Sequence, residues 1–195
     1  MSKHRIEALT DGIFAVAMTL LVMELKLPDA QAPGGLASGL VQLIPKFVSW
    51  IISFFVLGIF WFNQQRLFHH VKHVDGKLVW LSILCLSLVS LMPFSSSITG
   101  QFTLMLFSQI FYSANMAMLA GVALVTNRYA FRHADLMGTP VTQGFYRGVR
   151  FRMVGLIVIA FAAVGVARVV PGAGNMAFLL MIPISILSRR LERRS

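Results

Sequence analysis

The ionisable side chains that could carry chemistry in this sequence lie near the ends of apolar segments. The first apolar run has Glu7 and Asp11 near its start and Glu24 near its end. Ionisable groups in a membrane-length segment are costly, and they usually face other protein groups or water. Carboxylates in such positions can attract cations, carry a proton or hold a helix against its neighbours. These three acids are therefore the first candidates for function.

Three histidines form the second group of residues whose spacing could support chemistry. His69 and His73 are four residues apart and would share one face of a helix, with His70 beside them. A metal site needs further ligands, so a solvated connection or a structural polar contact explains the cluster better. The motifs HExxH, P-loop and GxSxG do not occur. We therefore expect neither an enzyme nor a cofactor, and no metal beyond a permeating ion; the single cysteine, Cys85, cannot form an intrachain disulfide.

The composition is that of a membrane protein. Of the 195 residues, 57% are apolar and 12% are charged, whereas ordinary soluble domains have about 45–50% and about 25%. The net charge of +10 would suggest nucleic-acid binding in a soluble protein. Here Lys and Arg fall at the ends of apolar runs, where they set membrane topology. We therefore expect no nucleic-acid partner.

Six apolar runs approach the ~20 residues that cross ~30 Å of hydrocarbon. They are Ala8–Leu27, Leu40–Phe62, Leu78–Ile98, Phe102–Thr126, Val149–Val169 and the shorter Met176–Leu187. With their polar ends, the expected helices cover about 6–27, 39–63, 77–98, 101–127, 148–170 and 174–189. The sequence thus predicts an all-α, polytopic membrane protein with six transmembrane helices in one domain, residues 1–195.

The distribution of basic residues supports an even number of crossings. Fourteen of the 17 Lys and Arg residues lie in the two termini and in the second and fourth connections. Because short cytoplasmic loops hold an excess of basic residues, both termini are predicted to be cytoplasmic in a multi-pass protein of the cell membrane. The competing interpretation is a signal peptide cleaved near residues 30–32, although Glu7 and Asp11 interrupt its pattern.

The first run carries one apolar stripe that suits a pore or a packing interface. On a helix that turns ~100° per residue, the stripe is about 100° wide. It holds Val16, Thr19, Leu20 and Met23. Asp11 lies about 140° from the direction of Val16 and so points toward neighbouring helices. Spacing alone favours a lipid-facing or core-packing stripe, with a structural role for Asp11.

The start of the first run also resembles a family signature. Residues 5–11, R-I-E-A-L-T-D, are similar to the R-x-x-x-F-S-D motif of the endosomal/lysosomal potassium channel family, the transmembrane protein 175 type, and its prokaryotic homologues. Leu9 stands in place of the family's Phe, and Thr10 in place of its Ser. The likeness continues through residues 60–68, 79–81 and 92–94, so it covers about half of the chain.

The resemblance implies a homotetramer of six-helix subunits, with the first helix of each subunit lining a central pore. By position, the pore constriction would fall on Val16, Leu20 and Met23, and Thr19 would add a ring of hydroxyls. The sequence has no TVGYG filter, and neither does the family. A ring of apolar side chains closes a pore by dewetting. The implied function is a cation channel that prefers K⁺ to Na⁺ without strict exclusion.

The resemblance also implies a network that holds the first helix to its own subunit. We expect it to join Arg5, Thr10 and Asp11, with Gln64 and Trp80 as partners. Family members commonly have His at the position of Gln64 or Gln65 in this sequence. The amide can hydrogen-bond but cannot supply a titrating group.

Three alternatives stay open. Glu24 would either concentrate cations at the outer mouth of the pore or be a simple interfacial charge beside Lys26. The whole chain could instead be a proton-coupled secondary transporter that uses a carboxylate such as Asp11, or a membrane scaffold without flux. The partners expected are monovalent cations, K⁺ above Na⁺, the lipid bilayer and other copies of the chain.

Overall fold

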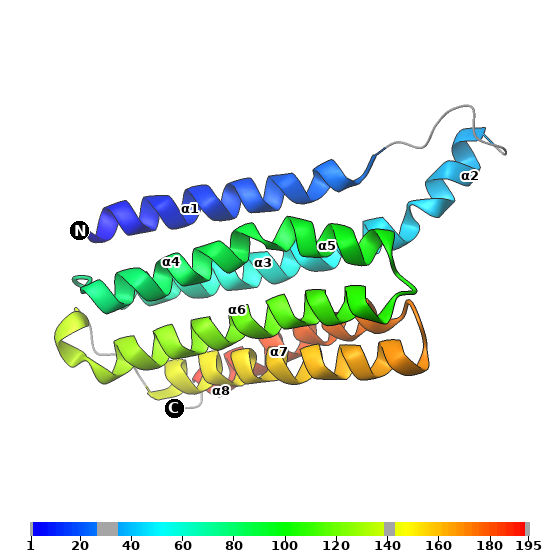
Figure 1. Cartoon of the computed structure of the whole chain (residues 1–195). Helices are drawn as coiled ribbons and strands as arrows, with labels where there is room; N and C mark the ends of the chain where they lie inside the picture. Colours follow the sequence, from blue (N-terminus) through cyan, green and yellow to red (C-terminus); the bar gives the residue numbers. More distant parts are fainter. Residues whose placement is uncertain (1, 27–34, 139–142, 194–195) are drawn as a thin grey trace.

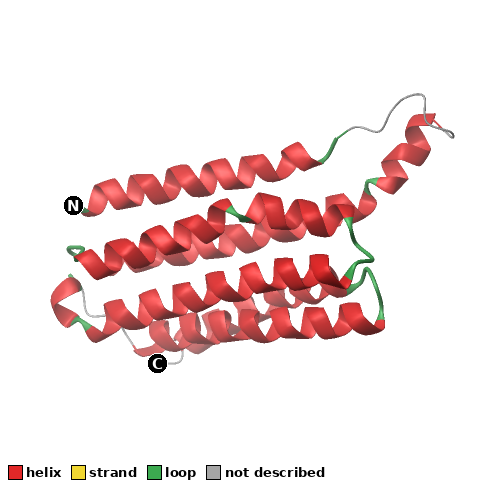
Figure 2. Ribbon diagram, in the orientation of Figure 1, coloured by secondary structure: helices red, strands yellow, loops and turns green. Residues whose placement is uncertain are grey.

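The protein is a bundle of helices (Figures 1 and 2). The computed structural model describes residues 2–26, 35–138 and 143–193, and no β-strand occurs in these ranges. The α-helices are α1 (Lys3–Leu20), α2 (Gly35–Gln42), α3 (Ile44–His70), α4 (Gly76–Ser90), α5 (Met92–Gln101), α6 (Leu106–Arg132), α7 (Gln143–Val169) and α8 (Met181–Arg193). The 3₁₀ helices are η1 (Leu21–Glu24), η2 (Ala134–Leu136) and η3 (Gly174–Leu180). The all-α fold predicted from the sequence is confirmed.

Five helical segments are long and apolar enough to cross a membrane. They are Lys3–Met23, Ile44–His70, Gly76–Gln101, Leu106–Arg132 and Gln143–Val169. The expected sixth crossing, residues 174–189, consists of η3 and most of α8, and its apolar part is the shorter segment Gly174–Ser185. The long segments agree with a multi-pass membrane protein, and the sixth crossing stays a prediction.

Three spans continue beyond the apolar runs at one end of the bundle. α3 ends at His70, α6 ends at Arg132 and α7 begins at Gln143. A helix of 27 residues, as each of these is, is about 40 Å long against about 30 Å of hydrocarbon. The ends therefore project toward the lipid headgroups. A small cluster of buried apolar side chains stabilises this region: Ile6, Leu67, Phe68, Val71, Leu78 and Ala130.

The helices form two sides around a shared core. α1 packs mainly on α4 and α3, whereas α7 packs mainly on α6 and α8, and Figure 1 shows α1 and α7 on opposite sides of the bundle. The core between them includes Phe14, Leu57, Met116 and Leu156, all fully buried. α1 has the smallest buried share of the five spans, 28%. Its outward side is therefore largely uncovered within the subunit.

The N-terminus and the end of α8 lie at the same end of the bundle, together with the α3–α4 and α6–α7 connections (Figure 1). The basic residues of these segments are thus gathered at one end. Arg152 is an exception to the expected loop position, because it is buried in α7, where Nη1 donates to Ser188 Oγ of α8 at 3.2 Å. The gathered charge is the arrangement that the positive-inside interpretation requires.

Backbone contacts tie the connections at this basic end together. Lys72 N donates to Leu136 O at 2.8 Å, and Gly138 N donates to His70 O at 2.9 Å. The rings of His69 and His70 meet edge to face at 5.4 Å between centroids. Over the described ranges, no group of His, Cys, Asp and Glu side chains is arranged to hold a metal ion. His69 and His70 are the last two residues of α3, and His73 lies in the connection that follows.

A layer of buried polar side chains crosses the other half of the bundle. Ser53 Oγ of α3 donates to Ser96 Oγ of α5 at 2.9 Å and lies 3.0 Å from Tyr112 Oη of α6. Asn175 Nδ2 of η3 donates to Ser49 Oγ at 3.3 Å. Because buried hydroxyls and amides are costly without partners, these contacts fix the register of α3, α5, α6 and η3.

Candidate ion pathway along the first helix

One face of α1 anchors the helix to its own subunit. Its buried side chains recur every three or four residues, which places them on one side of a helix. They are Ile6, Thr10, Phe14, Ala17 and, in the first residue of η1, Leu21. Phe14, Ala17 and Leu21 join the main hydrophobic core. This packing fixes which side of α1 is left uncovered.

The uncovered side carries the predicted pore residues. Val16 is 56% exposed, Leu20 47% and Met23 68%, and Thr19 is exposed as well. A shallow apolar groove of about 370 Å³ lies beside Val16 and Leu20, with Leu9 and Gly12 among its lining residues. The structure thus brings the predicted constriction residues onto one uncovered strip that runs along α1 and into η1, which holds Met23.

The hydroxyl of Thr19 donates its hydrogen bond within its own helix. Thr19 Oγ1 donates to Val16 O, one turn earlier, at 2.8 Å. A hydroxyl oxygen keeps acceptor capacity when its proton is donated, so the lone pairs of Thr19 remain available to a cation on the exposed side. Glu24 ends η1, but its side chain lies outside the described residues, and its place at a pore mouth stays a prediction.

Asp11 is the residue that ties the outer edge of α1 to α3. Asp11 Oδ1 accepts a hydrogen bond from Trp61 Nε1 at 2.9 Å and another from Gln65 Nε2. The sequence had suggested Gln64 and Trp80 as partners. Gln64 instead points into the subunit and is buried, while Trp80 is 72% exposed on α4. Within the described subunit, the donors to Asp11 are therefore Trp61 and Gln65, and its structural role stays a prediction.

The spacing of Trp61 and Gln65 in the sequence could have identified them as donors to Asp11. Trp61 and Gln65 are four residues apart on α3, so they present their N–H groups on the same helix face. Gln64 points about 100° away from Gln65 around the helix. This difference places Gln65 at the interface with α1 and Gln64 in the interior of the subunit. The helix period could have separated the two glutamines, but the register of α1 against α3 could not be obtained from spacing.

Arg5 and Thr10 do not join Asp11 in one network within the subunit. Arg5 is exposed, and six residues place it about 120° around the helix from Asp11. The ion pairs at this end, among the described side chains, are those of Glu7 with Lys3 at 3.6 Å and with His4 at 3.4 Å. Thr10 is buried, and its hydroxyl has no hydrogen-bond partner in the described subunit.

The sequence is similar to those of known ion channels. Residues 5–93 match the family model described as endosomal/lysosomal potassium channel TMEM175. A potassium channel of Streptomyces collinus is 38% identical over 98 residues, covering 50% of this chain and 48% of that protein. A potassium channel of Chamaesiphon minutus is 33% identical over 132 residues, covering 67% and 64%. The chain therefore spans about half to less than two thirds of the length of these curated relatives.

The fold likeness extends over almost the whole chain. The crystal structure of a lysosomal potassium-selective channel TMEM175 homologue from Chamaesiphon minutus superposes with a TM-score of 0.60 at 23% identity, covering 98% of this chain and 97% of that one. The family consists of ion channels and not of enzymes. Residues 5–93, which hold most of α1 together with α3 and α4, thus relate this chain to the endosomal/lysosomal potassium channel TMEM175 family, and the chain as a whole has the fold of a solved homologue.

Proposed function

We propose that this chain forms a potassium-preferring cation channel, a homotetramer whose central pore is lined by α1 of each subunit. The observation that carries the proposal is the uncovered apolar face of α1 at Val16, Leu20 and Met23, opposite a face that is packed into the core. Relatives named potassium channels support the assignment of the ion. The proposed pore uses no TVGYG filter and no cofactor; K⁺ is its permeating substrate.

The constriction works through water exclusion. Rings of Val16, Leu20 and Met23 side chains make a passage in which a water column is unstable, so the pore closes without a plug. When the α1 helices move apart, the passage hydrates and cations enter. Because one face of α1 is packed on α3 and α4, α1 can move outward only by sliding or tilting against these two helices. The hydrogen bonds from Trp61 and Gln65 of α3 to Asp11 cross this interface.

Selectivity comes from partial dehydration. The oxygen of Thr19 keeps lone pairs on the exposed side of α1 while its proton is bonded to Val16 O. A ring of such oxygens replaces some of the water around a passing ion, and K⁺ gives up water more readily than Na⁺. Because a hydroxyl ring is less constrained than stacked carbonyls, the preference is moderate. Glu24 adds negative charge near the outer mouth and raises the local cation concentration.

The protein acts in the cell membrane with both termini in the cytoplasm. The basic residues of the N-terminus and of the α3–α4 and α6–α7 connections lie at one end of the bundle, and the positive-inside rule places that end in the cytoplasm. Protease accessibility in right-side-out vesicles would test this orientation directly.

The experiment that tests the function is a reversal-potential measurement on purified protein in a planar bilayer with opposing K⁺ and Na⁺ gradients. A channel with the proposed pore gives a reversal potential displaced toward the K⁺ equilibrium potential, with conductance that rises with ion concentration. Saturable, proton-dependent uptake would identify a carrier instead. The absence of any flux from a monodisperse tetramer would leave a scaffold and would refute the channel.

A further inference from the structure

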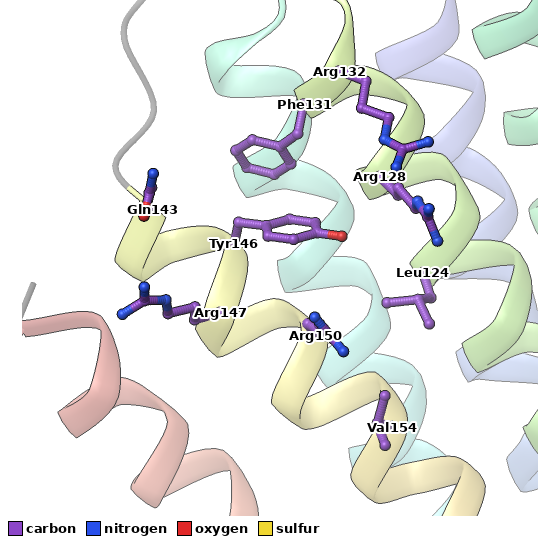
Figure 3. Close-up of a pocket in the computed structure, with 9 residues that line it drawn as sticks. All are labelled: Leu124, Arg128, Phe131, Arg132, Gln143, Tyr146, Arg147, Arg150 and Val154. Atoms are coloured by element: carbon purple, nitrogen blue, oxygen red, sulfur yellow. The ribbon is translucent and has the colours of Figure 1, made fainter.

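The end of the α6–α7 pair holds an arginine pocket that the ion pathway does not use. The pocket is about 850 Å³ in volume and opens between the last turns of α6 and the first turns of α7. Its basic residues are Arg128 and Arg132 from α6 and Arg147 and Arg150 from α7 (Figure 3). All four are exposed. Four guanidinium groups around one pocket make it strongly positive, which favours an anionic ligand.

No anionic counterpart comes from the described side chains. Among the described side chains the ion pairs involve Glu7, at the start of α1, and none of the described Asp or Glu residues lines the pocket. Guanidinium groups bind phosphate oxygens with paired N–H donors. The pocket therefore suits a phosphate group, and Tyr146, whose hydroxyl points across the pocket toward Arg128, adds a further donor (Figure 3).

The deeper part of the pocket is apolar. Leu124 and Val154 lie one turn below Arg128 and Arg150, toward the middle of the bundle. From Val154 an exposed apolar strip continues along α7 through Val158, 60% exposed, and Phe161, 72% exposed. A free phosphate would make no contact with this apolar strip, whereas the acyl chain of a lipid would cover it. The combination of a basic mouth and an apolar track indicates a phospholipid.

The depth of the arginines agrees with a headgroup. Arg128 is one turn from the end of α6, and Arg150 is about 10 Å from the start of α7. Because helices of about 40 Å exceed about 30 Å of hydrocarbon, these positions fall at the boundary between acyl chains and headgroups. Long arginine side chains reach from such positions into the polar layer.

We propose that the arginine pocket between α6 and α7 binds the phosphate headgroup of an anionic phospholipid, with an acyl chain lying along Val154, Val158 and Phe161. The pocket is lined by α6 and α7, and α7 lies on the side of the bundle opposite α1 (Figure 1). Its exposure to lipid in the assembled protein rests on the proposed arrangement with α1 at the axis. The lipid would hold α6 and α7 together at the end where residues of the connection approach the membrane surface.

The test measures lipid retention by the full-length protein in detergent, using native mass spectrometry with phosphatidylglycerol and with phosphatidylcholine of the same acyl chains. The wild-type protein should retain phosphatidylglycerol more tightly. The substitution R128Q/R150Q should weaken that retention by about tenfold to thirtyfold, because it removes two guanidinium groups that line the pocket and would bind the phosphate directly through charge-assisted hydrogen bonds. The matched control K72Q/K77Q removes the same charge from exposed residues at the same end and should retain the lipid as wild type does.

Two further arms make the result decisive. The variant R128K/R150K keeps the charge but loses the paired guanidinium donors, so its lipid retention should lie between that of the wild type and that of R128Q/R150Q, which separates lost affinity from lost folding. Inorganic phosphate and glycerol phosphate should not displace the lipid at equal concentration; displacement would identify the site as one for free phosphate and would overturn the lipid assignment. Equal retention of both lipids by the wild type, or equal retention by R128Q/R150Q, would also overturn it. Because the readout is binding, failure of the channel proposal would appear separately in the flux measurement.

Discussion

At the scale of single residues, α1 separates two tasks that lie on different sides of one helix. Val16, Leu20 and Met23 stay uncovered, while Asp11 is bonded to α3 by Trp61 and Gln65. Bulky apolar side chains in a ring exclude water, and a charged acceptor shared by two donors fixes orientation. Substitutions on the two sides should therefore have different effects.

Shorter side chains at the proposed constriction should lower the K⁺/Na⁺ selectivity and leave the fold intact. L20A and V16A remove apolar volume from the proposed ring, so water and hydrated Na⁺ enter more easily; the K⁺/Na⁺ permeability ratio should fall by about threefold or more. Reversal potentials measure the ratio. V158A is the control, because Val158 is similarly exposed but lies on α7. Unchanged ratios and open probability in both α1 variants would move the constriction elsewhere.

Removing the acceptor on α1 should loosen the helix. D11N replaces a charged acceptor by a neutral amide; hydrogen bonds to charged groups contribute about 1.5–3 kcal/mol when protected and less when exposed, so a loss of about 1–2 kcal/mol is expected. W61F removes one donor and should lose less. Thermal unfolding in detergent gives both values, with D135N as the exposed-carboxylate control. A wild-type midpoint and wild-type gating in D11N would argue against the anchor.

At the scale of helices, the sequence predicted five long apolar segments that the structure contains and a stripe on α1, but not the contacts between helices. Apolar runs locate the hydrocarbon-crossing part of each helix, and the helix period placed Val16 and Leu20 together, as found. Ser53 and Tyr112 sit in an apolar context in the sequence, and their pairing depends on the register of α3 against α6. Register is set by tertiary packing, which spacing along one chain does not encode.

The junction after α7 depends on a glycine. A Cβ at Gly174 would lie 2.5 Å from Gln109 Oε1 and 2.8 Å from the backbone oxygen of Ala163. The glutamine can move but the helix backbone cannot easily do so, and G174A should destabilise the protein by about 1–3 kcal/mol. G165A is the control: its Cβ meets nothing within 4 Å, so helix propensity should leave stability unchanged or raised by up to about 1 kcal/mol. Equal unfolding midpoints for the two variants would contradict the close approach at η3.

The α3–α4 connection has an acid-sensitive cap. Asp75 Oδ1 accepts from Leu78 N at 2.9 Å at the start of α4, and Tyr129 of α6 donates to the same carboxylate. Burial raises the pKa of Asp75, but the hydrogen bonds from Tyr129 and Leu78 outweigh it, so the net pKa lies below the ordinary value. A depressed folded pKa gives stability that is complete above the unfolded pKa and is lost as pH falls through the folded one.

The expected result is a difference between variants in an acid titration. Wild-type stability at the α4 end should decline as pH falls below about 4, whereas D75A should lose about 1 kcal/mol at neutral pH through the missing cap and show a flatter acid dependence. Unfolding midpoints between pH 3 and 7 measure both effects. Parallel curves for wild type and D75A would show that the carboxylate does not contribute.

At the scale of the whole molecule, two of the exposed apolar faces, those on α1 and α7, have different proposed occupants. The α1 side is proposed to meet other copies of α1, and the α7 side to meet lipid that is anchored by the arginine pocket. Met23 and Val158 are comparably exposed in the isolated subunit, at 68% and 60%. Only the assembly distinguishes them, since one would border an aqueous pore and the other an acyl chain.

Block of K⁺ flux by a membrane-impermeant methanethiosulfonate reagent exploits that difference. The sole cysteine, Cys85, is buried, so C85S provides a background into which M23C and V158C are introduced one at a time. If the α1 strip surrounds the conduction axis, the reagent should abolish flux through M23C and leave V158C conducting. Flux that persists in fully modified M23C, or equal inhibition of both variants, would contradict a pore lined by α1.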